Sequence, residues 1–264
     1  MSAPLRLGLV GCGKIARAQH LPAIAANPAL ELVAVADPGG AEVVVPCFAD
    51  VEAMLTAEPS IEAVILCQPP RARFACARDA IAAGRHVFLE KPPGATLSEV
   101  EALVGLASRR GVTLFSAWHS REGAAVAEAK RRLANIAVRS GSIVWKEDVR
   151  VWHPGQRWIW EAGGFGVFDP GINALSILTE IIPGEVLLVA AELSVPANCS
   201  VPIAASLALE TASGAAITAE FDFRQTGPQS WDIEFEHGAG RIALSHGGNA
   251  LSVDGAPYDL PAEE

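Results

Sequence analysis

The first residues that could do chemistry form a glycine-rich turn, Gly11-Cys12-Gly13-Lys14-Ile15-Ala16. An apolar run precedes this turn and a helical pattern follows it, which is the strand–turn–helix context of dinucleotide-binding sites. Gly11 permits a tight bend, and Gly13 lets the backbone approach a pyrophosphate with no side chain in between. The free N–H groups and the dipole of the following helix favour an anion there. The sequence therefore predicts a phosphate site, the alternative being a glycine turn without a ligand. The contacts are expected from Gly11, Gly13, Lys14 and Ile15.

Asp37 ends the second predicted strand, 21 residues after Ala16. This spacing is typical of an acid that accepts hydrogen bonds from the ribose hydroxyls of a dinucleotide. A carboxylate at this place repels the 2′-phosphate of NADP, and residues 38–40 offer no arginine to bind that phosphate. The sequence therefore favours NAD. NADP stays the alternative, because a cation elsewhere, such as Arg17, could bind the phosphate.

A lysine follows another predicted strand in the segment Glu90-Lys91-Pro92-Pro93. Lys91 is thus expected at the carboxyl edge of a parallel sheet, where ligands bind in doubly wound folds. The Lys91-Pro92 bond is a candidate for the cis form, which would hold the lysine rigidly. Taken alone, a Lys-Pro segment after a strand is more often an ordinary loop lysine than a catalytic one.

A second group of polar residues that could bind a substrate lies in the C-terminal part of the chain. Asp169 and Asn173 are four residues apart, so they share one face of a helix if that helix already includes Asp169. Alternatively, Asp169 caps the helix and Pro170 is its first residue. Three more residues near predicted strand ends are each either a ligand for hydroxyl groups or a structural hydrogen-bond partner: His119, Glu147 and His153.

The tryptophans are unevenly distributed, since Trp145, Trp152, Trp158 and Trp160 fall within sixteen residues. Aromatic faces pack on the C–H surface of a pyranose while a few polar groups fix its hydroxyls. Large aromatic residues are also common in cores and interfaces. We expect Trp152 and Trp231 to contact a substrate.

Two architectures follow one another along the chain. Residues 1–118 alternate short apolar strands with helices, which predicts a doubly wound parallel sheet of the Rossmann type. Helices are expected at 15–26, 51–57 with Asp50 as the N-cap, 73–83 with Gly84 after its end, and 99–109 with Ser98 as the N-cap. Residues 119–264 carry long strand-like runs, one of them 142–151. Alternation such as Thr218–Phe223 predicts a large, open, mostly antiparallel sheet with one wet face.

Composition excludes several classes of protein. The chain has 264 residues and a net charge of −10 with no basic run, which argues against nucleic-acid binding. No apolar stretch reaches the ~18 residues of a membrane helix, and Met1 leads into a strand pattern without a secretory leader. We therefore expect a cytoplasmic protein that is not a membrane protein. The five cysteines form no C-x-x-C pair and the histidines show no ligand spacing, so no metal site is expected.

The combination of motifs resembles the glucose–fructose oxidoreductase/inositol dehydrogenase (Gfo/Idh/MocA) family. The glycine-rich turn, Gln68-Pro69-Pro70 and Glu90-Lys91-Pro92 carry this resemblance. Within the family, the chain is most similar to aldose 1-dehydrogenases that oxidise D-galactose or L-arabinose to the lactone. That similarity rests on Trp152-His153-Pro154-Gly155, Gly163–Gly166 and Phe168–Asn173.

The resemblance implies an NAD(P)-binding Rossmann domain (1–118) and a substrate-binding sheet domain (119–264). It implies hydride transfer from C1 of the sugar to the nicotinamide. Lys91 would hold the C1 hydroxyl, Asp169 would accept its proton directly or by relay through Lys91, and Asn173 would orient the sugar. Further cofactor contacts are expected from Cys67, Gln68, Pro69, Glu90, Lys91 and Pro92. The expected substrate contacts are His119, Glu147, Trp152, His153, Asp169, Asn173 and Trp231. A homo-oligomer, dimer or tetramer, through the sheet face is also expected.

Three departures from the family pattern keep alternatives open. Inositol dehydrogenases of the family carry Asp-x-x-x-His on this helix, whereas here Asn173 replaces the histidine and cannot titrate. The chain also ends earlier than such relatives, and its segment after Asp37 is short. The alternatives are an inositol or polyol dehydrogenase and a non-catalytic sensor that binds a dinucleotide.

Overall fold

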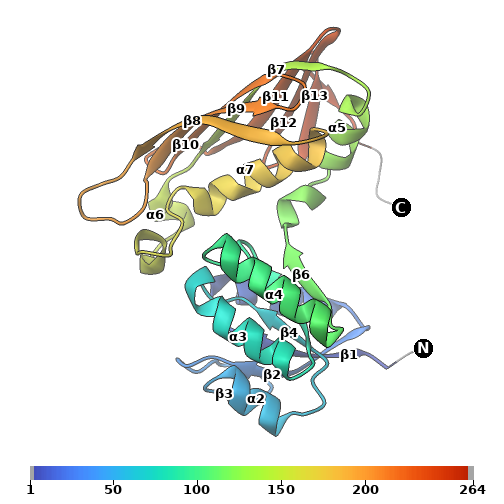
Figure 1. Cartoon of the computed structure of the whole chain (residues 1–264), viewed down its shortest axis with the longest axis vertical. Coiled ribbons are helices and arrows are strands. Elements are labelled where there is room, and N and C mark those ends of the chain that lie inside the picture. Colours follow the sequence, from blue (N-terminus) through green and yellow to red (C-terminus); the bar gives the residue numbers. More distant parts are fainter. Residues whose placement is uncertain (1–2, 261–264) are drawn as a thin grey trace. The chain divides into compact units, whose positions relative to one another are not determined.

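The computed structural model describes residues 3–260 and divides into two compact units. The first unit ends at Ala117 and the second begins at Trp118 (Figure 1). Among the described residues, none of the helices is both apolar and long enough to cross a bilayer.

A six-stranded, wholly parallel sheet forms the centre of the first unit, in the order β3-β2-β1-β4-β5-β6. Its strands are β1 Leu5–Val10, β2 Leu30–Ala36, β3 Cys47–Phe48, β4 Ala63–Leu66, β5 His86–Glu90 and β6 Leu114–Ala117. The order of the strands reverses between β1 and β4, which is the point where doubly wound sheets bind ligands. This confirms the predicted class of the first sheet.

Helices cover the sheet because its strands are apolar on both faces. They are η1 Ala16–His20, α1 Leu21–Ala26, α2 Val51–Ala57, α3 Pro70–Ala82 and α4 Leu97–Arg110. The core on one face joins strand residues to α2, α3 and α4, and the core on the other joins them to η1 and α1. The turn η1 is π-helical, a rare form that concentrates at functional sites.

The ends of these helices test the expected caps. Asp50 accepts a hydrogen bond from the Ala53 N–H at 2.8 Å, and Gly84 after α3 has φ +75°, both as predicted. The prediction of Ser98 as the cap of α4 is wrong. Thr96 caps this helix instead, because Glu99, three residues later, completes a capping box with it. Helix α3 also begins three residues earlier than predicted, with Pro70 at its first position, where proline is favoured.

The second unit contains an eight-stranded sheet in the order β14-β13-β12-β11-β7-β10-β9-β8. Its strands are β7 Val138–Lys146, β8 Val186–Ser194, β9 Ala204–Thr211, β10 Ala216–Asp222, β11 Ser230–His237, β12 Gly240–Ser245, β13 Ala250–Val253 and β14 Ala256–Tyr258. All neighbours are antiparallel except β7 and β10, which are parallel. Residues of β10 alternate between exposed and buried, so the mostly antiparallel sheet with one wet face is confirmed.

One strand is shorter in the structure than the sequence predicts. The run 142–151 ends as a strand at Lys146, and Val149–Trp152 forms the short helix α6. The physical reason is Asp148, whose carboxylate accepts a hydrogen bond from the Arg150 N–H and starts the helix. Strands β13 and β14 were not anticipated, because they are only four and three residues long.

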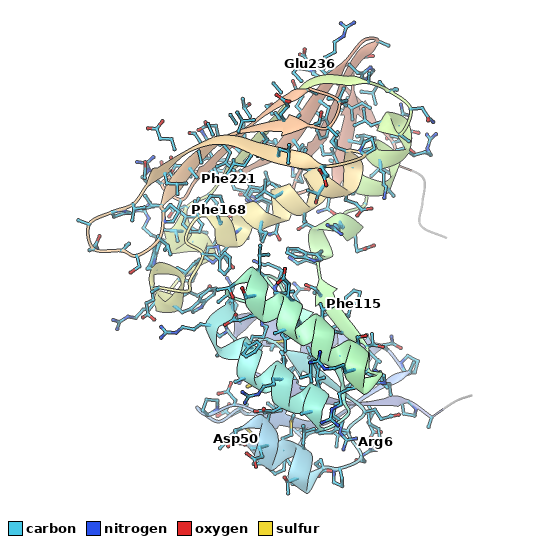
Figure 2. All side chains as sticks on the ribbon, in the orientation of Figure 1. Arg6, Asp50, Phe115, Phe168, Phe221 and Glu236 are labelled. Carbon is cyan, nitrogen blue, oxygen red and sulfur yellow. The ribbon has the colours of Figure 1, made fainter. Side chains whose placement is uncertain are left out.

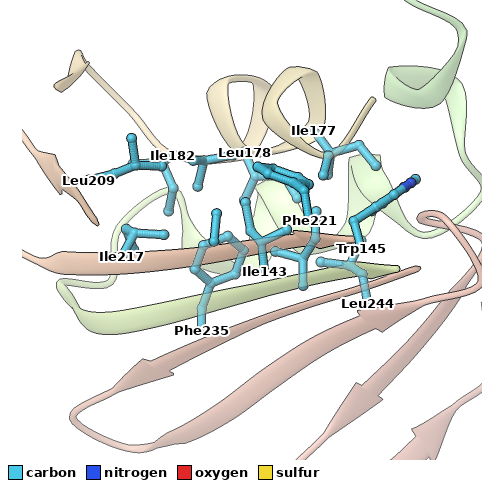
Figure 3. Close-up of a cluster of buried hydrophobic side chains, with 14 of the residues drawn as sticks. Ile143, Trp145, Ile177, Leu178, Ile182, Leu209, Ile217, Phe221, Phe235 and Leu244 are labelled. Atoms are coloured by element: carbon cyan, nitrogen blue, oxygen red, sulfur yellow. The ribbon is translucent and has the colours of Figure 1, made fainter. Parts of the chain in front are cut away.

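Two helices, α5 Val126–Leu133 and α7 Phe168–Ile181, contribute to the core on one face of this sheet. Ile177 and Leu178 of α7 point toward Phe221 and its neighbours on the strands (Figure 3). Phe168, at the start of α7, lies 5.7 Å from Phe221 between ring centroids (Figure 2). Gly171 allows this close approach, since a Cβ there would lie 2.9 Å from the Phe221 ring. The packing fixes the first turn of α7, which carries Asp169, against the sheet.

Candidate active site

The glycine-rich turn has the conformation that a dinucleotide requires. Gly11 has φ +86°, and a Cβ on it would lie 2.9 Å from the backbone nitrogen of Gln68. A Cβ on Gly13, by contrast, would meet no protein atom within 4 Å, so the backbone is open to an approaching phosphate. Lys14 and Ile15 follow directly at the start of the helical segment. The turn therefore fits a bound pyrophosphate.

Asp37 lies beside this turn. One carboxylate oxygen accepts the Cys12 N–H at 2.7 Å and the other accepts the Gly39 N–H at 2.9 Å. The Arg17 guanidinium is also close, since its Nε donates to the Cys12 carbonyl at 3.0 Å. The acid expected to bind the ribose is thus held in place by one backbone N–H of the phosphate turn and one of its own loop.

The loop after β5 carries Lys91, and the Lys91-Pro92 peptide bond is cis, as the sequence suggested. Glu90, which is 7 % exposed, accepts the Lys91 N–H on one carboxylate oxygen at 3.0 Å. Its other oxygen lies 2.7 Å from Nε2 of His20 in η1. The lysine loop is therefore connected to the turn that directly follows the glycine-rich segment.

The sequence interpretation missed Arg73, whose guanidinium is buried in the first unit. It donates to the backbone carbonyl oxygens of Gln68, Glu90 and Pro92. One signal could have identified it: Arg73 precedes Ala77, Ala80 and Ile81 at helical spacing, so a charge occupies the buried stripe of α3. Gln68 and Pro69 immediately precede this helix, so α3 begins within the expected cofactor loop.

Cys67 follows β4 and is not activated as a nucleophile. Burial, and secondarily the Glu90 carboxylate, raises the pKa of its thiol to about 12, so the thiol stays protonated at neutral pH. Its backbone N–H donates to the Val10 carbonyl at 2.8 Å. Cys67 can therefore shape the site but not attack a substrate.

In the second unit, four of the expected residues form one connected cluster. Glu147, only 2 % exposed, follows β7; its Oε1 lies 2.8 Å from His153 Nε2, and its Oε2 accepts the Trp231 indole N–H at 3.0 Å. Nδ1 of His153 lies 3.9 Å from a carboxylate oxygen of the buried Asp169. His153 thus lies between two acids contributed by different elements.

Trp152 joins the same group through aromatic contact. Its ring centroid lies 4.7 Å from that of Trp231, and Trp145 stacks on Trp231 at 5.9 Å. Trp145 is buried in the core, while Trp158 and Trp160 are only partly buried against it. The two indoles selected from the sequence as sugar contacts, Trp152 and Trp231, therefore lie next to the polar cluster.

Asp169 and Asn173 are both inside α7, because Val167 and not Asp169 is the N-cap. The alternative in which Pro170 begins the helix is wrong. The physical reason is that the Phe168 and Asp169 N–H groups already bond to the carbonyls of Phe165 and Gly166, so helical turns begin before Pro170. At a spacing of four residues, Asp169 and Asn173 share a face.

His119 lies apart from this cluster in sequence and in secondary structure. It begins the 3₁₀ turn η2 His119–Glu122, which packs against α7, and its Nδ1 lies 3.4 Å from the Ser120 hydroxyl. Within residues 3–260, no group of three or more His, Cys, Asp or Glu side chains could hold a metal ion. The second unit therefore offers carboxylates, imidazole, amide and indole groups for binding hydroxyls and moving a proton.

Comparison with known proteins identifies relatives along almost the whole chain. Residues 5–118 match the Gfo/Idh/MocA oxidoreductase family, described by its NAD-binding Rossmann fold. A galactose 1-dehydrogenase of Pseudomonas fluorescens is 44 % identical over 260 residues, which cover 98 % of this chain and 84 % of that protein. The crystal structure of a D-galactose-1-dehydrogenase from Rhizobium etli is 54 % identical, with a TM-score of 0.93 and the same two coverages. A dTDP-3,4-didehydro-2,6-dideoxy-alpha-D-glucose 3-reductase of Streptomyces antibioticus is 27 % identical over 92 % of this chain and 76 % of its own.

Proposed function

Because the chain belongs to the Gfo/Idh/MocA family of NAD-binding oxidoreductases, we propose that it oxidises an aldopyranose at C1 to the lactone. D-Galactose or L-arabinose is the proposed substrate. The observation that carries the proposal is the cluster of Glu147, His153, Asp169 and Trp231 in the second unit. Its composition suits a sugar, and relatives that cover nearly the whole chain are named for galactose.

The cluster supports sugar binding because polar and aromatic groups are combined in it. The rings of Trp152 and Trp231 would pack on the C–H face of the pyranose. Glu147, His153 and the amide of Asn173 would bind its hydroxyls, with His119 as a further ligand. The buried carboxylate of Glu147 already accepts two hydrogen bonds from its neighbours, so its position is fixed before a sugar arrives.

The proposed chemistry assigns different tasks to Lys91 and Asp169. The dinucleotide, when bound, supplies the acceptor for the hydride that leaves C1. Lys91 would hold the C1 oxygen and stabilise its developing negative charge. Asp169 would accept the hydroxyl proton, a role that Asn173 cannot take. His153, 3.9 Å from Asp169, is a titratable neighbour of that carboxylate.

We propose NAD as the preferred cofactor over NADP. The Asp37 carboxylate is held beside the phosphate turn by two N–H groups, and its charge would repel a 2′-phosphate. Arg17, whose guanidinium contacts the same turn, is the residue that would support NADP instead.

A second copy of the chain is the proposed partner, bound through the eight-stranded sheet. The edge strand β8 is exposed along its length, including Leu187, Leu188, Val189 and Leu193 at 50–65 %. Large apolar side chains that remain exposed along a strand of the sheet form a surface that another chain usually covers. Light scattering after gel filtration should give a mass above that of one chain, and Leu188→Lys should reduce it.

A panel of aldoses and inositols, each offered with NAD or NADP, tests the proposed activity through absorbance of the reduced nicotinamide. We expect reduction with D-galactose or L-arabinose and faster turnover with NAD. Reduction with inositols alone would favour a polyol dehydrogenase. Dinucleotide binding without any reduction across the panel would favour a sensor.

A further inference from the structure

We propose that Arg73 is a positioning residue that sets the place of Lys91. This inference rests on the proposed function, in which Lys91 holds the reacting oxygen. Arg73 does not itself contact substrate in this proposal; it acts through the backbone on both sides of the lysine.

The hydrogen-bond acceptors of Arg73 define its role. Its guanidinium donates to the carbonyl oxygen of Glu90, directly before Lys91, and to that of Pro92, directly after it. A further bond reaches the Gln68 carbonyl in the loop after β4. One side chain therefore fixes two peptide groups that bracket the lysine and ties them to the neighbouring loop.

Arginine is suited to this task in a way that lysine is not. Its planar guanidinium presents five N–H donors in a rigid fork, whereas an ammonium is a compact point charge on a flexible stem. Arg73 is only 2 % exposed, and these carbonyls accept hydrogen bonds that water would otherwise accept from its guanidinium. A substitution that keeps the charge but loses the fork should shift the Lys91 loop while the sheet stays intact.

Glu90 supplies a second restraint on the same loop. Its carboxylate accepts the Lys91 N–H at 3.0 Å and is itself held by His20 at 2.7 Å. The carbonyls are thus fixed by α3 and the Lys91 amide is fixed by way of η1. Because a misplacement of about 1 Å at a reacting group can cost 10²-fold in rate, this double restraint matters for turnover.

The test compares Arg73→Lys with Arg78→Lys. Arg78 is a matched control, because it lies in the same helix α3 but is exposed and pairs with Asp79. We expect Arg73→Lys to lower kcat about 10- to 100-fold, and to raise the KM for sugar more than the Kd for NAD. Arg78→Lys should behave as the wild type. Equal kcat values for the two variants would overturn the proposal.

Hydrogen exchange measured by mass spectrometry separates this inference from the proposed function. In Arg73→Lys, the Lys91 amide should exchange faster while peptides from β4 keep their protection, whether or not any sugar is a substrate. Unchanged protection of Lys91, or an equal loss in β4, would contradict a positioning role.

Two further variants cover the case in which the lysine variant does not fold. Arg73→Gln places a neutral side chain at this buried position and should show the same kcat and exchange pattern. Arg73→Ala should regain turnover when guanidinium chloride is added at low concentration, whereas Arg78→Ala should not respond. A lack of rescue together with wild-type Lys91 exchange in Arg73→Gln would reject the proposal.

Discussion

The loop that carries Lys91 and the cluster around Glu147 are both held by hydrogen bonds, but different groups form these bonds in the two regions. Around Lys91 the restraints act on the backbone: carbonyls of Glu90 and Pro92 accept from Arg73, and the lysine amide donates to Glu90. Around Glu147 the bonds join side chain to side chain, from His153 and Trp231. The hydrogen bonds around Lys91 therefore fix the course of a chain segment, whereas those around Glu147 fix the orientation of individual side chains.

The largest expected effect comes from Asp169→Asn, which keeps the shape of the side chain but removes the proposed proton acceptor. Turnover should fall on the order of 10²–10⁴, while the fold and NAD binding persist. Steady-state kinetics and dinucleotide titration measure both quantities. Asp79→Asn, at an exposed position, serves as the control. Near-normal turnover would remove Asp169 from the mechanism.

Lys91→Ala tests the proposed role of the Lys91 side chain in the loop that is held by backbone hydrogen bonds. Losing one donor to the developing charge costs about 10²–10³ in kcat, and sugar affinity should weaken more than NAD affinity. The change removes only the side chain, so the bonds from Arg73 to the flanking carbonyls remain available. Kinetics with varied sugar and varied NAD separate these effects. A loss confined to NAD binding would assign Lys91 to the cofactor alone.

Glu147→Gln tests the side-chain cluster with a smaller expected effect. The amide retains one oxygen but loses an acceptor for one of its two partners, which should cost about 1–3 kcal/mol of unfolding free energy. The KM for sugar should rise more than kcat falls. Denaturant unfolding and kinetics give both values. Glu220→Gln, at an exposed carboxylate near Lys146, should change neither.

The smallest effect is expected at a helix cap that has no proposed role in catalysis. Thr96→Ala removes the cap of α4 and should lower the unfolding free energy by about 1 kcal/mol. Ser98→Ala, inside the same helix, should have little effect, since Thr96 already supplies the capping box. Urea unfolding of both variants measures the difference. A larger loss for Ser98→Ala would contradict the observed cap.

These regions also differ in how far the sequence could predict them. The glycine turn and the lysine loop can be recognised in the sequence, because their unusual backbone conformations require glycine or proline. The alternation of strands and helices likewise identified the parallel sheet, and a period of two identified the wet face of β10. These features are local, so neighbouring residues suffice to read them.

Other features depend on contacts between distant segments. Nothing near His20 indicates that it bonds to Glu90, which is 70 residues away. Arg73 reaches carbonyls through a fold that brings three segments together, and only its place on the buried stripe of α3 hinted at this. The short strands β13 and β14 exist through pairing, which their own residues do not specify.

The π-helical turn η1 determines where the side chain of His20 lies relative to Glu90. A π turn contains one residue more than an α turn, so the residues after it are rotated by about 100° relative to an uninterrupted α-helix. His20 stands at the end of that turn, directly opposite Glu90. Shortening the segment by a single residue would swing the imidazole away and leave the carboxylate beside Lys91 with one partner fewer. The number of residues in η1, and not only their types, therefore helps to determine the conformation of the loop that carries Lys91.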